Sequence, residues 1–128
     1  MEAISEIKRT EVKNYRRSFL IHHRDQLIPL GVEKIAYFYI EDELIFCKTH
    51  EPKRYVVDLA LDKVENQTDP QEFFRVNRQF LISRQSVVSA SQHFNRKLKL
   101  DLIPPPETDV IISKTKAIAF KKWLENAD

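Results

Sequence analysis

A single glycine, Gly31, is present in this chain of 128 residues. Its scarcity excludes the nucleotide-binding folds that hold phosphate in a glycine-rich loop, such as the P-loop and the dinucleotide fingerprint. Tight turns must therefore be built from Asp, Asn, Pro and charged residues. We expect such turns to connect the secondary-structure elements along the whole chain.

Short apolar runs separated by polar turns dominate the chain from residue 15 onward. Two hairpins are predicted, turning at residues 23–25 and 41–43, because paired β-like runs flank each polar segment. Apolar and charged residues alternate along residues 97–103, which indicates a half-buried strand. The other expected strands are 17–22, 26–30, 35–40, 44–47, 54–57, 74–76, 80–82, 87–90 and 110–112.

Two short helices are also predicted. Asp58 is a suitable N-cap for a helix that runs through Gln67, and Ser113 is one for a closing helix from Lys114 to Glu125. The chain has neither a βαβ rhythm nor an internal repeat. We therefore expect a mainly β, antiparallel fold of about eight to ten short strands with one or two short helices, including a C-terminal helix.

The length fits one domain, which we place at residues 15–128, with residues 1–14 as a linker or N-terminal lead-in. The lone Cys47 allows no disulfide within the chain and favours a buried strand residue in a reducing cytosol. No apolar run approaches the roughly 20 residues of a membrane span, and the first residues lack the apolar region of a signal peptide. We expect a cytoplasmic protein without membrane contact.

Positive charge is concentrated in residues 71–100, although the net charge of the chain is only +2. This stretch has one acidic side chain, Glu72, and such an imbalance suggests a surface that faces a polyanion. Its six basic side chains are Arg75, Arg78, Arg84, Arg96, Lys97 and Lys99.

Arg78 interrupts the strand pattern of this basic stretch. One uninterrupted strand over residues 75–83 would bury the Arg78 guanidinium among apolar side chains, which is costly without a partner. An exposed turn of Asn77, Arg78 and Gln79 between two short strands is simpler. Arg suits guanine edges and Asn or Gln suits adenine. The alternative is a solvated turn with a structural ion pair, and Arg75 is a candidate for either an ion pair or a phosphate contact.

Other chemistry has weaker support in the sequence. The four histidines lie in different predicted elements or on opposite strand faces, so we expect no metal site and no cofactor. No Ser or Cys has an activating context, and no carboxylate pair stands out, so we do not expect an enzyme. Aromatic residues could stack on single-stranded bases, but Tyr37, Phe38, Tyr39 and Phe46 lie in apolar runs that favour a core.

The segment 73–82 resembles the most diagnostic stretch of the LytTR family. The family pattern runs aromatic, Arg, aliphatic, His or Asn, Arg, small polar, aromatic, aliphatic. Residues 32–38 resemble the family element that introduces its central hairpin. Residues 97–100 and 110–114 resemble its last strands and the start of its final helix. The resemblance covers about residues 15–125.

The resemblance implies a bacterial DNA-binding domain, usually the C-terminal output half of a two-component response regulator. Family members place loops between strands in successive DNA grooves, often on paired direct repeats, where a dimer could form. The implied DNA-binding residues are Arg75, Asn77, Arg78, Gln79, Ser113, Lys114 and Lys116. A lysine in the first helical turn, such as Lys114, opposes the helix dipole, which makes sense if it serves a ligand; the alternative is an ordinary solvated side chain.

The implied partners are double-stranded DNA, a receiver domain and a sensor kinase. The chain has no room for a receiver domain, so we expect either an excised domain or a stand-alone variant. The main alternative is a β-rich protein-interaction or ligand-sensing module, and a small histidine enzyme is a weaker one. One departure from the family is the acidic hairpin tip at residues 41–43. It either points away from DNA, which we favour, or accepts a hydrogen bond from cytosine N4, or marks a member that docks through fewer loops.

Overall fold

The structure is a computed structural model that describes residues 14–126. Within that range the chain forms ten strands and two helices, which confirms the predicted mainly β fold with a C-terminal helix. The predicted linker lies outside the described residues apart from Asn14. The elements are β1 (Ser18–His23), β2 (Gln26–Gly31), β3 (Ile35–Glu41), β4 (Leu44–Thr49), β5 (Arg54–Val57), α2 (Leu61–Gln67), β6 (Phe73–Arg75), β7 (Phe80–Ser83), β8 (Val87–Gln92), β9 (Leu98–Leu102), β10 (Val110–Ile112) and α3 (Lys114–Glu125).

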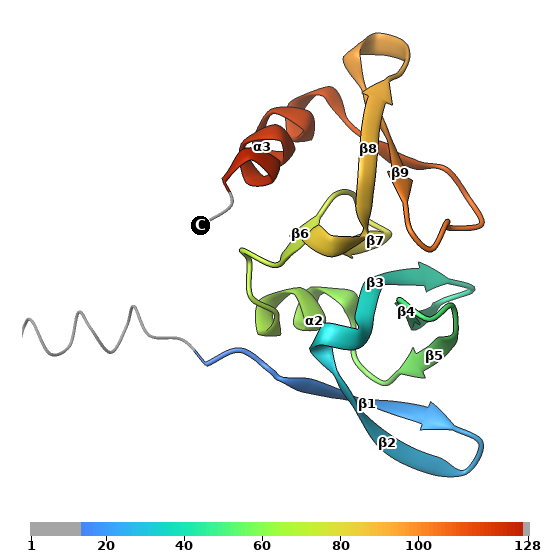
Figure 1. Cartoon of the computed structure of the whole chain (residues 1–128). Helices are drawn as coiled ribbons and strands as arrows, with labels where there is room; N and C mark the ends of the chain where they lie inside the picture. The colour runs from blue at the N-terminus through green and yellow to red at the C-terminus, as the bar shows by residue number, and fades with distance from the viewer. Residues whose placement is uncertain (1–13, 127–128) are drawn as a thin grey trace, which may run out of the picture.

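The strands form two sheets (Figure 1). The first has the order β2-β1-β5-β4-β3-β7-β6, and the second has the order β10-β9-β8. Neighbouring strands are antiparallel throughout, as the absence of a βαβ rhythm predicted. The sheets are successive along the chain, and the second continues directly into α3.

The tight turns use polar residues in the left-handed backbone region, as the scarcity of glycine predicted. In the β3–β4 turn, Asp42 and Glu43 have φ angles of 52° and 65°, and in the β8–β9 turn Asn95 and Arg96 have φ angles of 57° and 62°. Two consecutive positive φ angles are typical of the turn that matches the twist of a two-residue hairpin. The predicted β3–β4 turn was one residue too long, because Glu41 still pairs with Leu44.

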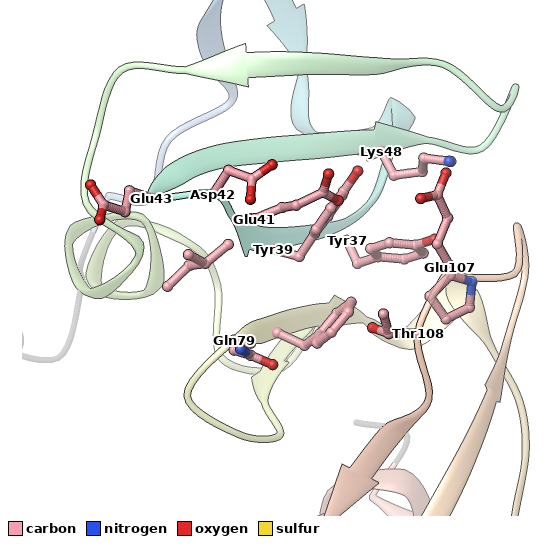
Figure 2. A pocket seen from close by; sticks show the side chains of 12 residues that line it. Tyr37, Tyr39, Glu41, Asp42, Glu43, Lys48, Gln79, Glu107 and Thr108 are labelled. Carbon is pink, nitrogen blue, oxygen red and sulfur yellow. The ribbon is translucent and has the colours of Figure 1, made fainter.

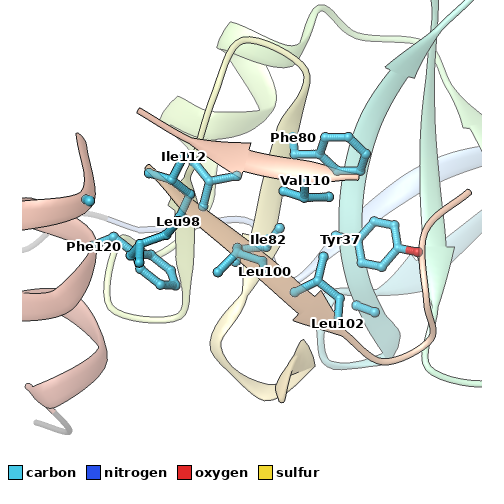
Figure 3. Close-up of a cluster of buried hydrophobic side chains, with 12 residues drawn as sticks. Tyr37, Phe80, Ile82, Leu98, Leu100, Leu102, Val110, Ile112 and Phe120 are labelled. Atoms are coloured by element: carbon cyan, nitrogen blue, oxygen red, sulfur yellow. The ribbon is translucent and has the colours of Figure 1, made fainter. Parts of the chain in front are cut away.

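The first sheet buries apolar side chains on both faces. One face packs against the second sheet and α3 through a cluster shown in Figure 3. The opposite face packs against α2, whose Leu61 and Val64 are buried. The first cluster contains Tyr37, Phe80, Ile82, Leu98, Leu100, Leu102, Val110, Ile112 and Phe120, among others. Alternation along β9 places its three leucines in this core and leaves Lys99 and Asp101 exposed, as predicted.

Of two further predictions, the N-cap of α2 is wrong and the burial of Cys47 is confirmed. The N-cap of α2 is Ala60 and not Asp58, and the helix begins at Leu61. Asp58 lies too far ahead of the first turn to cap it, with its carboxylate 3.9 Å from the imidazole of His22. Cys47 is fully buried in β4 as predicted, and burial raises the pKa of its thiol to about 12.

Arg84 fixes α3 to the first sheet. Its guanidinium lies 4.2 Å from the ring centroid of Trp123 and donates to the backbone carbonyls of Trp123 and Leu124. The Trp123 indole in turn donates to the carbonyl of Pro70 at 2.8 Å. These bonds satisfy carbonyls that are left unpaired at a helix C-terminus. They therefore fix the position of α3, including its N-terminus beside β6 and β10.

Candidate nucleic-acid interface

The connection between β6 and β7 is an exposed turn, as the register break at Arg78 predicted. Arg78 and Gln79 are exposed, whereas Asn77 is half-buried. The Asn77 side chain accepts hydrogen bonds from the backbone N–H groups of Gln79 (2.8 Å) and Phe80 (2.9 Å). It also donates to the carbonyl of Ile111 in β10 at 3.0 Å. Asn77 therefore shapes the turn and ties it to the second sheet.

Arg75 also stabilises the β6–β7 turn through hydrogen bonds. Its guanidinium donates to the carbonyls of Asn77 (2.8 Å) and Arg78 (2.7 Å). It also lies 3.0 Å from carboxylate oxygens of both Asp62 and Glu65 on α2. Only 15% of the Arg75 side chain is exposed. Of the two roles considered for Arg75, this geometry supports the structural ion pair, because four of its five N–H groups are already used.

A pocket of about 580 Å³ lies between this turn and the N-terminus of α3. We call it the basic groove. Four cationic side chains line it with a single carboxylate, that of Asp62, which is already paired with Arg75. Its lining residues are Asp62, Arg75, Val76, Asn77, Arg78, Lys97, Ile111, Ser113 and Lys116. The net charge of the groove is therefore strongly positive, which favours an anionic ligand.

The N-terminus of α3 forms one wall of the basic groove. Ser113 is the N-cap of α3, and its hydroxyl accepts from the backbone N–H of Lys116 at 3.2 Å, as the sequence predicted. The Lys116 ammonium lies 5.5 Å from the ring centroid of Phe74. Lys114 is exposed in the first turn but does not line the groove. The positive end of the helix dipole adds to the side-chain charges here.

The basic stretch is only partly available to a ligand. Arg75 and Arg84 hold the fold together, and the Lys99 ammonium lies 3.5 Å from the carboxylate of Asp109. Among residues 14–126, Arg78, Arg96 and Lys97 form no ion pair. Net charge along the sequence could not distinguish the engaged cations from the available ones. The groups that bind the engaged cations lie on other elements of the fold.

An acidic pocket of about 390 Å³ lies on the other side of the turn (Figure 2). Four carboxylates line it, those of Glu41, Asp42, Glu43 and Glu107, together with a single cation, Lys48. Arg54 donates to both Glu41 and the hydroxyl of Tyr39 at 3.2 Å, and these bonds raise the pKa of Arg54. Gln79 lines this pocket together with Phe80, and it does not line the basic groove.

Tyr37 also lines the acidic pocket. Its hydroxyl donates to the carbonyl of Pro104 at 3.0 Å. Burial, followed by the nearby Tyr39 and Glu107, raises the pKa of Tyr37 well above that of a free tyrosine. The phenol therefore stays neutral and acts as a structural hydrogen-bond donor.

The family model described as the LytTr DNA-binding domain matches residues 25–125. The chain belongs to the LytTR family. Among solved structures, a similar fold is found in the LytTr DNA-binding domain of a Bacillus cereus protein named a methyl-accepting/DNA response regulator. The two structures superpose with a TM-score of 0.73 at 18% sequence identity, over 85% of this chain and 97% of the other. No match was found among curated proteins.

In this LytTR domain, five of the seven predicted DNA-binding residues line the basic groove: Arg75, Asn77, Arg78, Ser113 and Lys116. Lys114 lies beside the groove, and Gln79 faces the acidic pocket. The sequence interpretation did not select Lys97 as a site residue. The pairing register could have indicated it, because β9 and β10 pair Leu98 with Ile112, which places Lys97 opposite Ser113.

LytTR domains are DNA-binding modules and not enzymes. Within residues 14–126, no group of three or more His, Cys, Asp or Glu side chains is arranged to hold a metal ion. In the same part of the chain, no helix is long and apolar enough to cross a membrane.

Proposed function

We propose that this LytTR domain binds double-stranded DNA sequence-specifically, as the output module of a bacterial transcriptional regulator in the cytoplasm. In this proposal the β6–β7 turn presents Arg78 to base edges, and the N-terminus of α3 binds the neighbouring backbone. Membership of the family implies DNA binding in transcriptional regulation. The sequence-specific mode and the residues involved are our inference.

The basic groove is the observation that carries this proposal. Arg78, Lys97 and Lys116 come from three separate elements and meet beside a helix N-terminus. Arg78 lies on a turn whose backbone is held by hydrogen bonds from Arg75 and to Asn77, so the starting point of its side chain is well defined. An exposed guanidinium on such a turn can form the paired hydrogen bonds that distinguish guanine in the major groove.

The acidic pocket supports one orientation of the domain on DNA. Its four carboxylates lie next to Gln79, on the opposite side of the turn from the basic groove. They repel phosphates, so DNA is favoured only on the groove side. This arrangement agrees with the sequence-based preference for an acidic tip that points away from DNA. Asp42 and Glu43 then act by excluding the wrong orientation.

The wider regulatory context is also part of the proposal. We infer that a receiver domain controls this LytTR domain and that a sensor kinase acts on the receiver. Two domains are proposed to occupy paired direct repeats, as a dimer on DNA. Support for this context comes from the response-regulator name of the structurally similar Bacillus cereus protein.

Electrophoretic mobility shifts with random duplex DNA at several salt concentrations test the proposed function. If about 4–6 phosphates are neutralised, the logarithm of the binding constant should fall against the logarithm of salt with a slope of about −4 to −5. A slope near zero, or no binding at low salt, would show that the groove serves another ligand. That outcome would favour the alternative of a protein-interaction or ligand-sensing module.

Lys114→Ala is expected to weaken binding of a cognate duplex by about 1 kcal/mol, close to fivefold, by removing a phosphate contact at the edge of the groove. Thermal stability should stay unchanged or rise slightly, since the lysine charge opposes the helix dipole. Lys121→Ala, near the other end of α3, is the matched control and should leave affinity unchanged. Equal affinity of Lys114→Ala and the unmodified protein would remove Lys114 from the interface.

A further inference from the structure

Phe94, at the tip of the β8–β9 hairpin, is 79% exposed, more than any other large hydrophobic residue described. The tip around it is a closed turn. The Lys97 N–H donates to the carbonyl of Phe94 at 3.1 Å, and the His93 N–H donates to the carbonyl of Lys97 at 2.9 Å. The ring of His93 packs edge-on against Phe94, with centroids 5.3 Å apart. The phenyl ring of Phe94 is therefore exposed to solvent on a turn whose backbone is hydrogen-bonded.

The charged residues next to Phe94 in the sequence are cationic. Arg96 and Lys97 follow it in the same turn, and neither forms an ion pair within residues 14–126. No Asp or Glu occurs anywhere from Phe73 to Leu100. An exposed aromatic ring beside two uncompensated cations fits a ligand that offers both phosphate and apolar surface.

The hairpin tip is continuous with the basic groove. Strand β10 ends at Ile112, opposite Leu98, whereas the β8–β9 hairpin continues for several more residues. Lys97 lines the groove together with Arg78 and Ser113, so residues 94–96 project beyond the groove at its α3 side. Figure 1 shows this tip extending from the body of the domain, past α3.

We propose that the β8–β9 hairpin tip, residues 93–97, is an additional DNA-contacting element that docks in the minor groove next to the major-groove site of Arg78. This inference rests on the proposed function and extends the interface to an element that the proposed function does not use. Phe94 packs against sugars and the edge of a base step. Arg96 occupies the narrow groove, where the negative potential is strongest, and Lys97 binds the adjacent phosphate.

An anionic membrane also offers negative charge together with an apolar interior, but the position of the β8–β9 hairpin tip favours DNA. Lys97 belongs both to the tip and to the groove that holds Arg78 and Lys116. A single continuous duplex can contact both regions, whereas a membrane bound at the tip would leave the groove empty.

The test begins with selection of duplexes from a random pool by the unmodified domain. The selected duplex is then used to compare Phe94→Ala with Leu27→Ala. Leu27 is a matched control, because it is 58% exposed and lies beside the turn of the β1–β2 hairpin. Both variants should keep the melting temperature of the unmodified protein, since each loses an exposed side chain. Affinity, hydroxyl-radical footprints and binding to vesicles with anionic lipid are measured for each.

We expect Phe94→Ala to weaken binding of the selected duplex about tenfold and to lose minor-groove protection on one flank only. Leu27→Ala should retain both the affinity and the footprint. If Phe94→Ala binds and protects the duplex like the unmodified protein, the inference fails while the proposed function stands. Vesicle binding that depends on Phe94, with unchanged DNA binding, would overturn it in favour of a membrane surface. If the unmodified domain selects no duplex at all, both proposals fail.

Discussion

Arg78→Ala is expected to weaken binding of a selected duplex by about 1–3 kcal/mol, roughly 5- to 150-fold, and to relax the base preference at one position. Arg78 is exposed and forms no ion pair within the described residues, so its guanidinium is available to a base edge. The backbone of the turn is held by Arg75 and Asn77 and does not depend on the Arg78 side chain. The melting temperature should therefore remain unchanged.

Two controls make this expectation specific. Arg78→Lys keeps the charge but loses the planar pair of donors, so it should retain the salt dependence while losing base preference. Arg17→Ala removes an exposed arginine from the lead-in to β1 and should change neither property. An Arg78 variant with a lower melting temperature but an unchanged base preference would show that the side chain serves the fold and not recognition.

The exposure of Arg78 was predictable because it follows from a local conflict. A strand through this segment would have placed a guanidinium on the same face as Phe80 and Ile82, both of which are buried. The bounds of β5, β10 and α3 were predicted correctly for a similar reason, since polar or capping residues flank their apolar patterns. Local physical chemistry specifies such features without knowledge of distant contacts.

The start of α2 shows where local signals mislead. Asp58 is a good capping residue by type, but the helix begins three residues later behind Ala60, which has no side-chain cap bond. Burial of Leu61 and Val64 against the first sheet sets the first turn. Tertiary packing therefore overrides a capping preference worth about 1 kcal/mol.

The roles of Arg75 and Gln79 depend on contacts far along the sequence. Arg75 is neutralised by Asp62 and Glu65, 13 and 10 residues earlier. Gln79 lies beside carboxylates of the β3–β4 turn, which only the pairing of β3 with β7 brings near. The charge of the basic stretch indicated a polyanion-binding surface, but the fold decides which cations remain available.

Asn77→Ala is expected to lower the free energy of unfolding by about 2–3 kcal/mol, because it removes three hydrogen bonds and leaves partly buried backbone groups unpaired. Urea unfolding measures this loss. DNA affinity should fall as well, since the turn that presents Arg78 loses its link to Ile111 in β10. The base preference of whatever binding remains should still be that of the unmodified protein.

Asn77→Asp separates the two halves of this role. The carboxylate can still accept from the N–H groups of Gln79 and Phe80, so the local turn is kept, but it cannot donate to the carbonyl of Ile111. Stability should fall by only about 1 kcal/mol, while the added negative charge in the basic groove weakens DNA binding further than the stability loss explains. If Asn77→Ala instead keeps full stability and relaxes the preference at one base, Asn77 reads DNA directly. The Arg78 turn must then be held by Arg75 alone.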